Sequence, residues 1–172
     1  TDADFFLMKD AAVTSLEINV ESGAIVTGTA SFLGATLEAS ETTYAAGTHT
    51  AAGSTNVISA VDSEVIIYLG DSGASSSISN VQSLSFTLEN SLREQRRVGT
   101  STLAGIGSGR FTASGSMVMY FETISEYTNF MNETVRELKV EMKNGLKGYT
   151  FEFPKVKYTQ IEVLTTGIES DI

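Results

Sequence analysis

The stretch Val13-Thr-Ser-Leu-Glu-Ile-Asn-Val-Glu21 decides the fold of this chain, because its pattern returns almost unchanged as Val81-Gln-Ser-Leu-Ser-Phe-Thr-Leu-Glu89. Apolar and polar residues alternate strictly in both copies, and this period of two predicts half-buried β-strands. One face of each strand is apolar, with Leu16, Ile18 and Val20 in the first copy and Leu84, Phe86 and Leu88 in the second. The other face is small, hydroxylated and acidic, without Lys or Arg. This twice-built polar surface is the best indication of function.

The polar pattern continues into the strand that follows each copy, within 24–33 and within 111–122. Each repeat, 13–34 and 81–122, therefore predicts a strand pair, and the second pair encloses a long glycine-punctuated loop at 91–110. The small polar residues that we expect to alternate with apolar ones on these strands are Glu17, Asn19, Glu21, Thr27, Thr29, Ser31, Ser85, Thr87, Glu89, Thr112, Ser114 and Ser116.

The rest of the chain predicts more strands and one helix. Segment 35–80 is rich in Ala, Ser, Thr and Gly, which indicates loops or an insertion around a short strand at 65–69. Thr123 and Glu126 form a capping box that opens an amphipathic helix over 124–134. Strand alternation resumes at Leu138, a hairpin is expected at Asn144-Gly145, and 155–163 is expected to add a last strand.

Together these elements predict a mainly β chain with eight or more strands and one helix. We expect one domain over 1–172, in which the repeat is only partial because the first copy lacks an evident helix and long loop. No run of residues is long and apolar enough to cross a membrane, and Thr1–Asp4 has no basic region of the kind that opens a secretory signal. The chain has no cysteine, so it has no disulfide framework and no thiolate metal site.

Charge is distributed unevenly along the chain. The net charge is −10, and only Lys9 is basic in 1–92 against 11 acidic residues. Residues 93–172 are neutral, with 10 basic and 10 acidic residues. A domain this acidic is not expected to bind nucleic acid through the phosphates, because such binding needs Lys and Arg to displace counterions.

Enzyme chemistry has little support in the sequence. His49 is the only histidine and has no evident partner, so we expect a solvated loop residue rather than a general base. Gly105-Ile-Gly-Ser-Gly-Arg110 has glycines but lacks the Lys-Ser/Thr of a phosphate-binding loop and precedes a strand. No loop has the carboxylate spacing of a calcium site. We expect no catalytic residue, no bound metal and no cofactor.

The loop at 91–110 carries the only concentrated positive charge, from Arg93, Arg96, Arg97 and Arg110, with Glu94 among them. A solvated loop is the simplest interpretation. A positive loop and a strongly negative body on one chain also allow copies to meet head to tail, which is the kind of contact that builds rings or stacks.

Three segments resemble the tail tube (major tail) proteins of long-tailed bacteriophages. They are Val13 to Gly34, Leu84 to Arg93 with the following loop and Gly109 to Ser116, and the helix with the strands after it. The resemblance covers most of 1–34 and 81–163 and rests on pattern and order of elements.

The resemblance implies an antiparallel β-sandwich with one flanking helix, whose inner sheets join into a barrel around a bore. Rings of six subunits, or of three subunits with a duplicated domain, would stack into the tube of the virion tail after assembly in the host cytoplasm. The polar residues named above would then line the bore, where DNA passes without specific binding, and Arg93, Glu94, Arg96, Arg97 and Arg110 would form the ring-stacking contact.

A polar wall without cations suits the passage of DNA, because cations would hold the phosphates. Other tail proteins at the tube ends would be partners. Two alternatives remain open at this point: the tube of a secretion or contractile injection system, and a carbohydrate-binding or other ligand-binding β-sandwich. The second usually needs exposed aromatic platforms, and this chain has no Trp.

Overall fold

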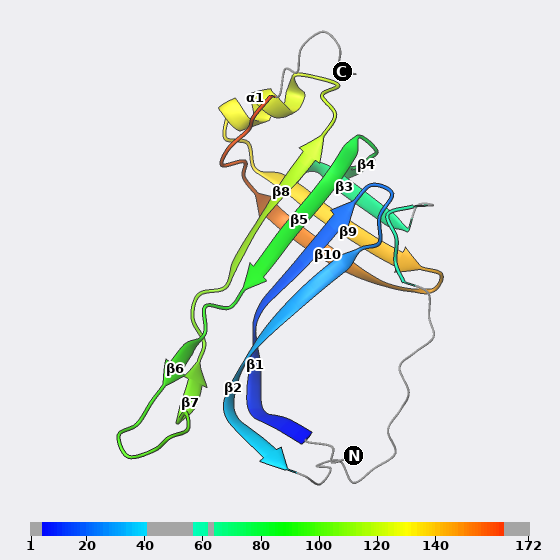
Figure 1. Cartoon of the computed structure of the whole chain (residues 1–172). Helices are drawn as coiled ribbons and strands as arrows, with labels where there is room; N and C mark the ends of the chain where they lie inside the picture. Colours follow the sequence, from blue (N-terminus) through cyan, green and yellow to red (C-terminus); the bar gives the residue numbers. More distant parts are fainter. Residues whose placement is uncertain (1–4, 41–56, 62–63, 164–172) are drawn as a thin grey trace. The chain divides into compact units, whose positions relative to one another are not determined.

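The computed structural model describes residues 5–40, 57–61 and 64–163, and within them the chain is mainly β (Figure 1). Strands account for 61% and helix for 5%, which confirms the predicted fold class, although the single chain closes no barrel. The described elements are β1 (Phe5–Glu21), β2 (Thr27–Ser40), β3 (Val65–Asp71), β4 (Ala74–Ile78), β5 (Val81–Glu89), β6 (Arg93–Gln95), β7 (Gly105–Gly107), β8 (Thr112–Met119), α1 (Ser125–Met131), β9 (Arg136–Asn144) and β10 (Lys147–Val156).

The two repeated stretches lie side by side in the middle of one sheet, whose strand order is β2-β1-β5-β8 (Figure 1). The Ser22 amide donates to the Gln82 carbonyl and the Asn90 amide donates to the Thr14 carbonyl, both at 2.9 Å. Between these two bonds β1 advances by eight residues while β5 goes back by eight, so the strands are antiparallel and keep their register. The two strand pairs therefore meet through their first strands.

A second antiparallel sheet has the order β10-β9-β3-β4. The hairpin predicted at Asn144-Gly145 forms, with Gly145-Leu146 as its two-residue loop, since Asn144 still pairs with Lys147. Gly145 takes the left-handed conformation that a tight hairpin turn requires, with φ +62°. β4, made largely of serine, is tied to β9 through Glu137, which accepts hydrogen bonds from the Ser75 hydroxyl at 2.6 Å and the Gly73 amide at 2.8 Å.

The described chain forms two compact units. The first contains residues 5–18, 27–40 and 85–115, and the second contains 19–26, 57–61, 64–84 and 116–163. The prediction of a single domain over 1–172 stays a prediction.

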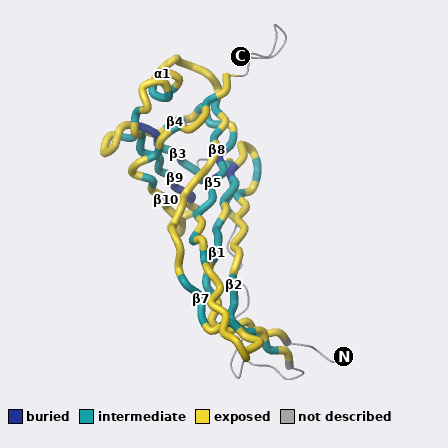
Figure 2. Tube along the Cα trace, turned by 90° about the vertical axis from the view of Figure 1, so that its left-hand side faces the viewer, coloured by how far each residue is buried: buried dark blue, intermediate teal, exposed yellow. Residues whose placement is uncertain are grey.

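The second unit holds most of the buried core. Its buried apolar residues are Val20, Ile67, Leu69, Leu84, Val140 and Met142. They come from both sheets, and the predicted inward residues of β5 and β9 are among them. Burial of such side chains contributes roughly 1.5–3 kcal/mol each to folding, so this unit has the main apolar driving force. Figure 2 shows how few positions outside this core are fully buried.

Three local predictions were wrong or incomplete. The capping box does not form: Ile124 is the N-cap, without a side-chain cap bond, and the Thr123 hydroxyl lies 2.6 Å from the Ser125 hydroxyl instead. The helix ends at Met131, and Glu133 follows with φ +50°. No strand occurs in the described residues 157–163, because β10 ends at Val156, opposite the first residue of β9.

Segment 35–80 holds more strand than its composition suggests. Residues 35–40 belong to β2, and β3 and β4 occupy 65–71 and 74–78. Residues 41–56, which include His49, lie outside the described part of the chain, as do 62–63. β3 confirms the short strand expected at 65–69.

Candidate assembly surfaces

The register of β1 against β5 brings the polar residues of the two repeats together. Counting from the Asn90–Thr14 bond, Glu17 lies opposite Thr87, and counting from the Ser22–Gln82 bond, Glu21 lies opposite Ser83. Residues directly opposite each other in an antiparallel pair point to the same face. The acidic and hydroxyl residues of β1 and β5 therefore share one face, and the buried Val20, Leu84 and Phe86 lie on the other.

Two glycines show how the outer strands are oriented. A Cβ on Gly28 would lie 2.9 Å from Cδ1 of Ile18, and a Cβ on Gly115 would lie 3.1 Å from Cβ of Phe86. Both glycines thus belong to the apolar face. Thr27 and Thr29 in β2, and Ser114 and Ser116 in β8, alternate with these glycines and take the opposite face.

Most residues of this polar face are exposed in the single chain. Asn19, Ser85 and Thr87 are partly buried, whereas the exposed members are Glu17, Glu21, Thr27, Thr29, Ser31, Glu89, Thr112, Ser114 and Ser116. All four strands contribute, and none of these residues is a cation.

The loop 91–110 is partly ordered into a small two-stranded sheet. β6 pairs with β7, with Glu94 opposite Ile106 and Gln95 opposite Gly105. The loop is attached to the β1–β2 hairpin by the Leu103 amide, which donates to the Ala35 carbonyl at 3.4 Å. At its base the Asn90 side chain donates to the Val13 carbonyl at 2.9 Å. The loop 91–110 is therefore an ordered part of the first unit, and we call it the projection.

The structure places the predicted cations on the surface of this projection. Arg96 forms an ion pair with Glu94 and donates twice to one carboxylate oxygen, from Nη2 at 2.6 Å and from Nε at 2.9 Å. Arg93, Arg97 and Arg110 are exposed and have no ion pair within the described part of the chain. Three charges of the loop are thus available to another molecule.

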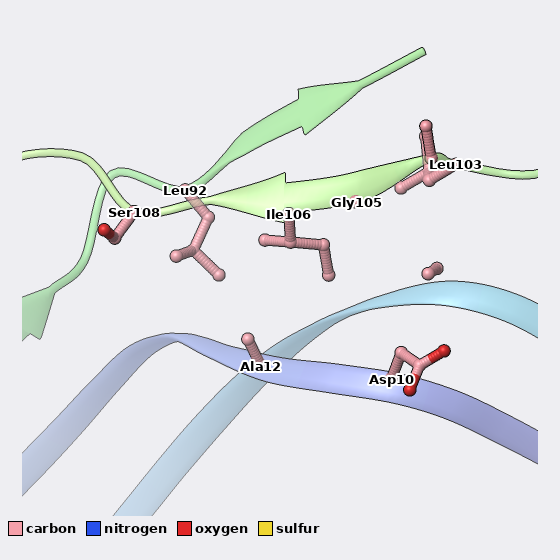
Figure 3. A pocket seen from close by; sticks show the side chains of 9 residues that line it. Asp10, Ala12, Leu92, Leu103, Gly105, Ile106 and Ser108 are labelled. Carbon is pink, nitrogen blue, oxygen red and sulfur yellow. The ribbon is translucent and has the colours of Figure 1, made fainter. Parts of the chain in front are cut away.

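A hollow of about 450 Å³ lies beneath the same projection (Figure 3). Leu92 and Ile106 point into it from the loop, and Ala12 and Asp10 face it from β1. Ala35, Leu103, Ala104, Gly105 and Ser108 complete its lining. Asp10 lies within β1 with φ +51°, and its carboxylate is the only charged group in the lining. The lining of the hollow combines apolar side chains with one carboxylate and the Ser108 hydroxyl. No local pattern in the sequence indicates this hollow, because its residues come from distant segments.

Large apolar side chains are uncovered in both units. In the first unit the exposed ones are Phe6, Met8, Val13, Phe32, Leu37, Val98 and Phe111, and in the second unit they include Tyr120, Phe121, Ile124, Tyr127 and Met131. α1 buries none of its residues. Such extensive uncovered apolar surface is typical of a chain that packs against other chains.

Sequence reasoning missed a charged cluster that holds α1 in the second unit. Arg136 donates from Nη1 to Asp71 at 2.7 Å and from Nη2 to Glu126 at 3.1 Å, and the Tyr158 hydroxyl donates to Glu126 at 2.7 Å. Burial and the bond to Glu126 raise the pKa of Tyr158 well above its ordinary value. Glu126 therefore contacts two distant residues rather than the helix N-terminus. No local spacing could reveal a cluster whose members are far apart in the chain.

A metal site and a phosphate-binding turn were the other candidate sites in the sequence. They contain no group of three or more His, Cys, Asp or Glu side chains placed to hold a metal ion. Residues 105–107 of the glycine-rich segment form β7 instead of a phosphate-binding turn. Within the same part of the chain, no helix has the length and apolarity needed to cross a membrane.

The described residues combine an open sheet with one polar face, a cationic projection and uncovered apolar side chains, which are features typical of a β protein that packs against other chains. Comparison with known families gives the same answer. The family model described as phage tail tube protein matches residues 1–170, so the chain belongs to the phage tail tube protein family. It is a structural protein of the virion tail, and membership implies assembly with itself into a tube. No curated protein matches the chain.

Proposed function

We propose that this protein forms rings that stack into the tail tube, with the polar face of the β2-β1-β5-β8 sheet lining the bore. The observation that carries the proposal is the arrangement of that sheet, in which four adjacent strands present hydroxyl and acidic residues on one face. Arg and Lys are missing from the twelve candidate positions. DNA driven along such a wall meets no cation that would hold its phosphates.

The ends of this sheet support ring closure by strand pairing. β2 and β8 stand at the two ends of the described strand order. An exposed strand edge carries unpaired backbone donors and acceptors, and pairing β8 of one subunit with β2 of the next removes both edges. Both copies of the repeat belong to one sheet of one subunit, since β1 and β5 are neighbours in it. This favours six single-sheet subunits per ring over three duplicated ones.

Stacking of the rings is assigned to the projection at 91–110. Its exposed Arg93, Arg97 and Arg110, with the Arg96–Glu94 pair, face an acidic body in the next ring. Assembly takes place in the host cytoplasm, DNA passes through the finished tube during ejection, and the protein has no catalytic activity and needs no cofactor.

Electron microscopy of the purified chain tests the proposal. Rings or tubes with a bore wide enough for duplex DNA are expected, and a protein that stays monomeric at every concentration would contradict it. Because the chain has no cysteine, single substitutions can then map the bore. Thr29→Cys should react with a large maleimide polymer in dissociated subunits and be protected in assembled tubes. Equal reactivity in both states would place Thr29 outside the bore.

A further inference from the structure

The tip of the projection carries an apolar side chain that is fully exposed among the described residues. Val98 is 106% exposed, and it lies between Arg97 and Gly99 in the connection from β6 to β7. Gly99 takes φ +88°, so the chain turns sharply after Val98. Exposing a valine at such a turn leaves apolar area in water that contact with another molecule would remove.

The hollow beneath the projection has the matching character. Ala12, Ala35, Leu92, Leu103 and Ile106 give it apolar walls, and Asp10 gives it one carboxylate (Figure 3). Asp10 takes part in none of the ion pairs found among the described residues, and the neighbouring Lys9 is paired with Glu38 at 2.6 Å. At the tip, Arg96 is paired with Glu94, whereas Arg97 has no ion pair within the described residues. The tip is thus apolar and cationic, and the hollow combines apolar side chains with one carboxylate.

We propose that Val98 of one copy inserts into this hollow of a second copy in the adjacent ring, with Arg97 placed against Asp10. The inference rests on the proposed tube and specifies its stacking contact. Every copy offers both a tip and a hollow, so the contact is head to tail. Between copies in successive rings such a contact can repeat along the tube axis, as a growing tube requires. The apolar fit supplies affinity, and the charge pair fixes orientation.

Engineered disulfides test the contact directly, because the chain has no cysteine of its own. The variant with Val98→Cys and Ala12→Cys should give a ladder of covalently linked copies when assembled tubes are oxidised mildly. The matched control carries Ala12→Cys with Leu146→Cys, because Leu146 lies at the β9–β10 turn and is as exposed as Val98. This control variant should give no ladder. Loss of both thiols without a ladder would show that the tip fills its own hollow, and would overturn the inference.

A charge exchange provides a second, independent measurement. Asp10→Arg and Arg97→Asp should each reduce the yield of sedimentable tubes by about tenfold, which corresponds to about 1.4 kcal/mol at the contact, and the double variant should restore it. If the wild-type chain forms tubes, but the cysteine variant gives no ladder and the double charge variant restores no tubes, this contact is overturned and the tube function stands. A wild-type chain that never forms rings or tubes would overturn both.

Discussion

At the scale of single residues, Arg136 joins α1 to the strands of the second unit. Its guanidinium joins Asp71 at the end of β3 to Glu126 in α1, while its own side chain is only 13% exposed. Its Nε is buried without a hydrogen-bond partner among the described residues. α1 has no buried residue and no side-chain cap, so these polar bonds contribute much of its attachment.

Arg136→Met should therefore lower the free energy of unfolding by about 1–3 kcal/mol, since Glu126 loses its cation and keeps only the Tyr158 hydroxyl. Urea denaturation followed by circular dichroism measures the change. Lys157→Met is the matched control, because its pair with Glu133 spans 3.3 Å at an exposed site and should contribute less than about 0.5 kcal/mol. Equal effects in the two variants would contradict a structural role for Arg136.

Tyr158 predicts a stability change at alkaline pH. Its folded pKa is raised, first by burial and then by the bond to Glu126. A raised folded pKa means that the stabilisation is complete below the ordinary tyrosine pKa of about 10 and is lost as the pH rises above it. The wild-type urea midpoint should fall more steeply between pH 10 and 12 than that of Tyr158→Phe. Parallel curves for the two proteins would argue against this linkage.

At the scale of elements, β8 shows how close packing selects a small residue. A Cβ on Gly115 would lie 2.5 Å from the Ser85 carbonyl oxygen and 3.1 Å from Cβ of Phe86, one of the few buried side chains. The backbone atoms cannot move aside without breaking the β5–β8 pairing. Glycine at this position therefore allows β8 to join the sheet.

Gly115→Val should destabilise the protein by about 1–3 kcal/mol through overpacking, as seen in a lower thermal midpoint. Ala113→Val makes a similar change two residues earlier on the same strand, at an exposed position, and should alter stability by less than about 0.5 kcal/mol. If both variants have the same thermal midpoint as the wild type, β8 is not packed on β5 as described.

At the scale of the whole molecule, the distribution of charge matters more than its total. The projection at 91–110 carries exposed cations on a chain whose net charge is −10. Copies of such a chain repel one another unless the cations face acidic surface, so location decides whether subunits attract.

Reversing Arg93, Arg96 and Arg97 to Glu should abolish tubes in electron micrographs while the circular dichroism spectrum stays that of the wild type. Reversing Lys147, Lys155 and Lys157 to Glu is the control. Both triple variants take the net charge from −10 to −16, and only the first alters the projection. Tubes formed normally by the first variant would show that the loop does not stack the rings.

The sequence by itself determined the local features of this protein: the alternating strands, the Asn144-Gly145 hairpin, the polar face and the uneven charge. These depend on neighbours in the chain, through the period of two and the conformational freedom of glycine. It also pointed to the tail tube family through the order of its elements. The cationic loop was visible as composition, whereas its ordering into β6 and β7 was not.

Only the tertiary structure decided which strands became neighbours and what each polar side chain contacted. β4 forms a strand because β3 supplies its hydrogen bonds, although its serines favour turns. Residues 157–163 alternate but form no strand, because β9 begins at Arg136 and the ladder with β10 ends there. Glu126 accepts hydrogen bonds from Arg136 and Tyr158 instead of forming the predicted capping box. Asp10 lines a hollow together with Leu92 and Ile106. Each of these contacts joins residues distant in the chain, and no local pattern encodes them.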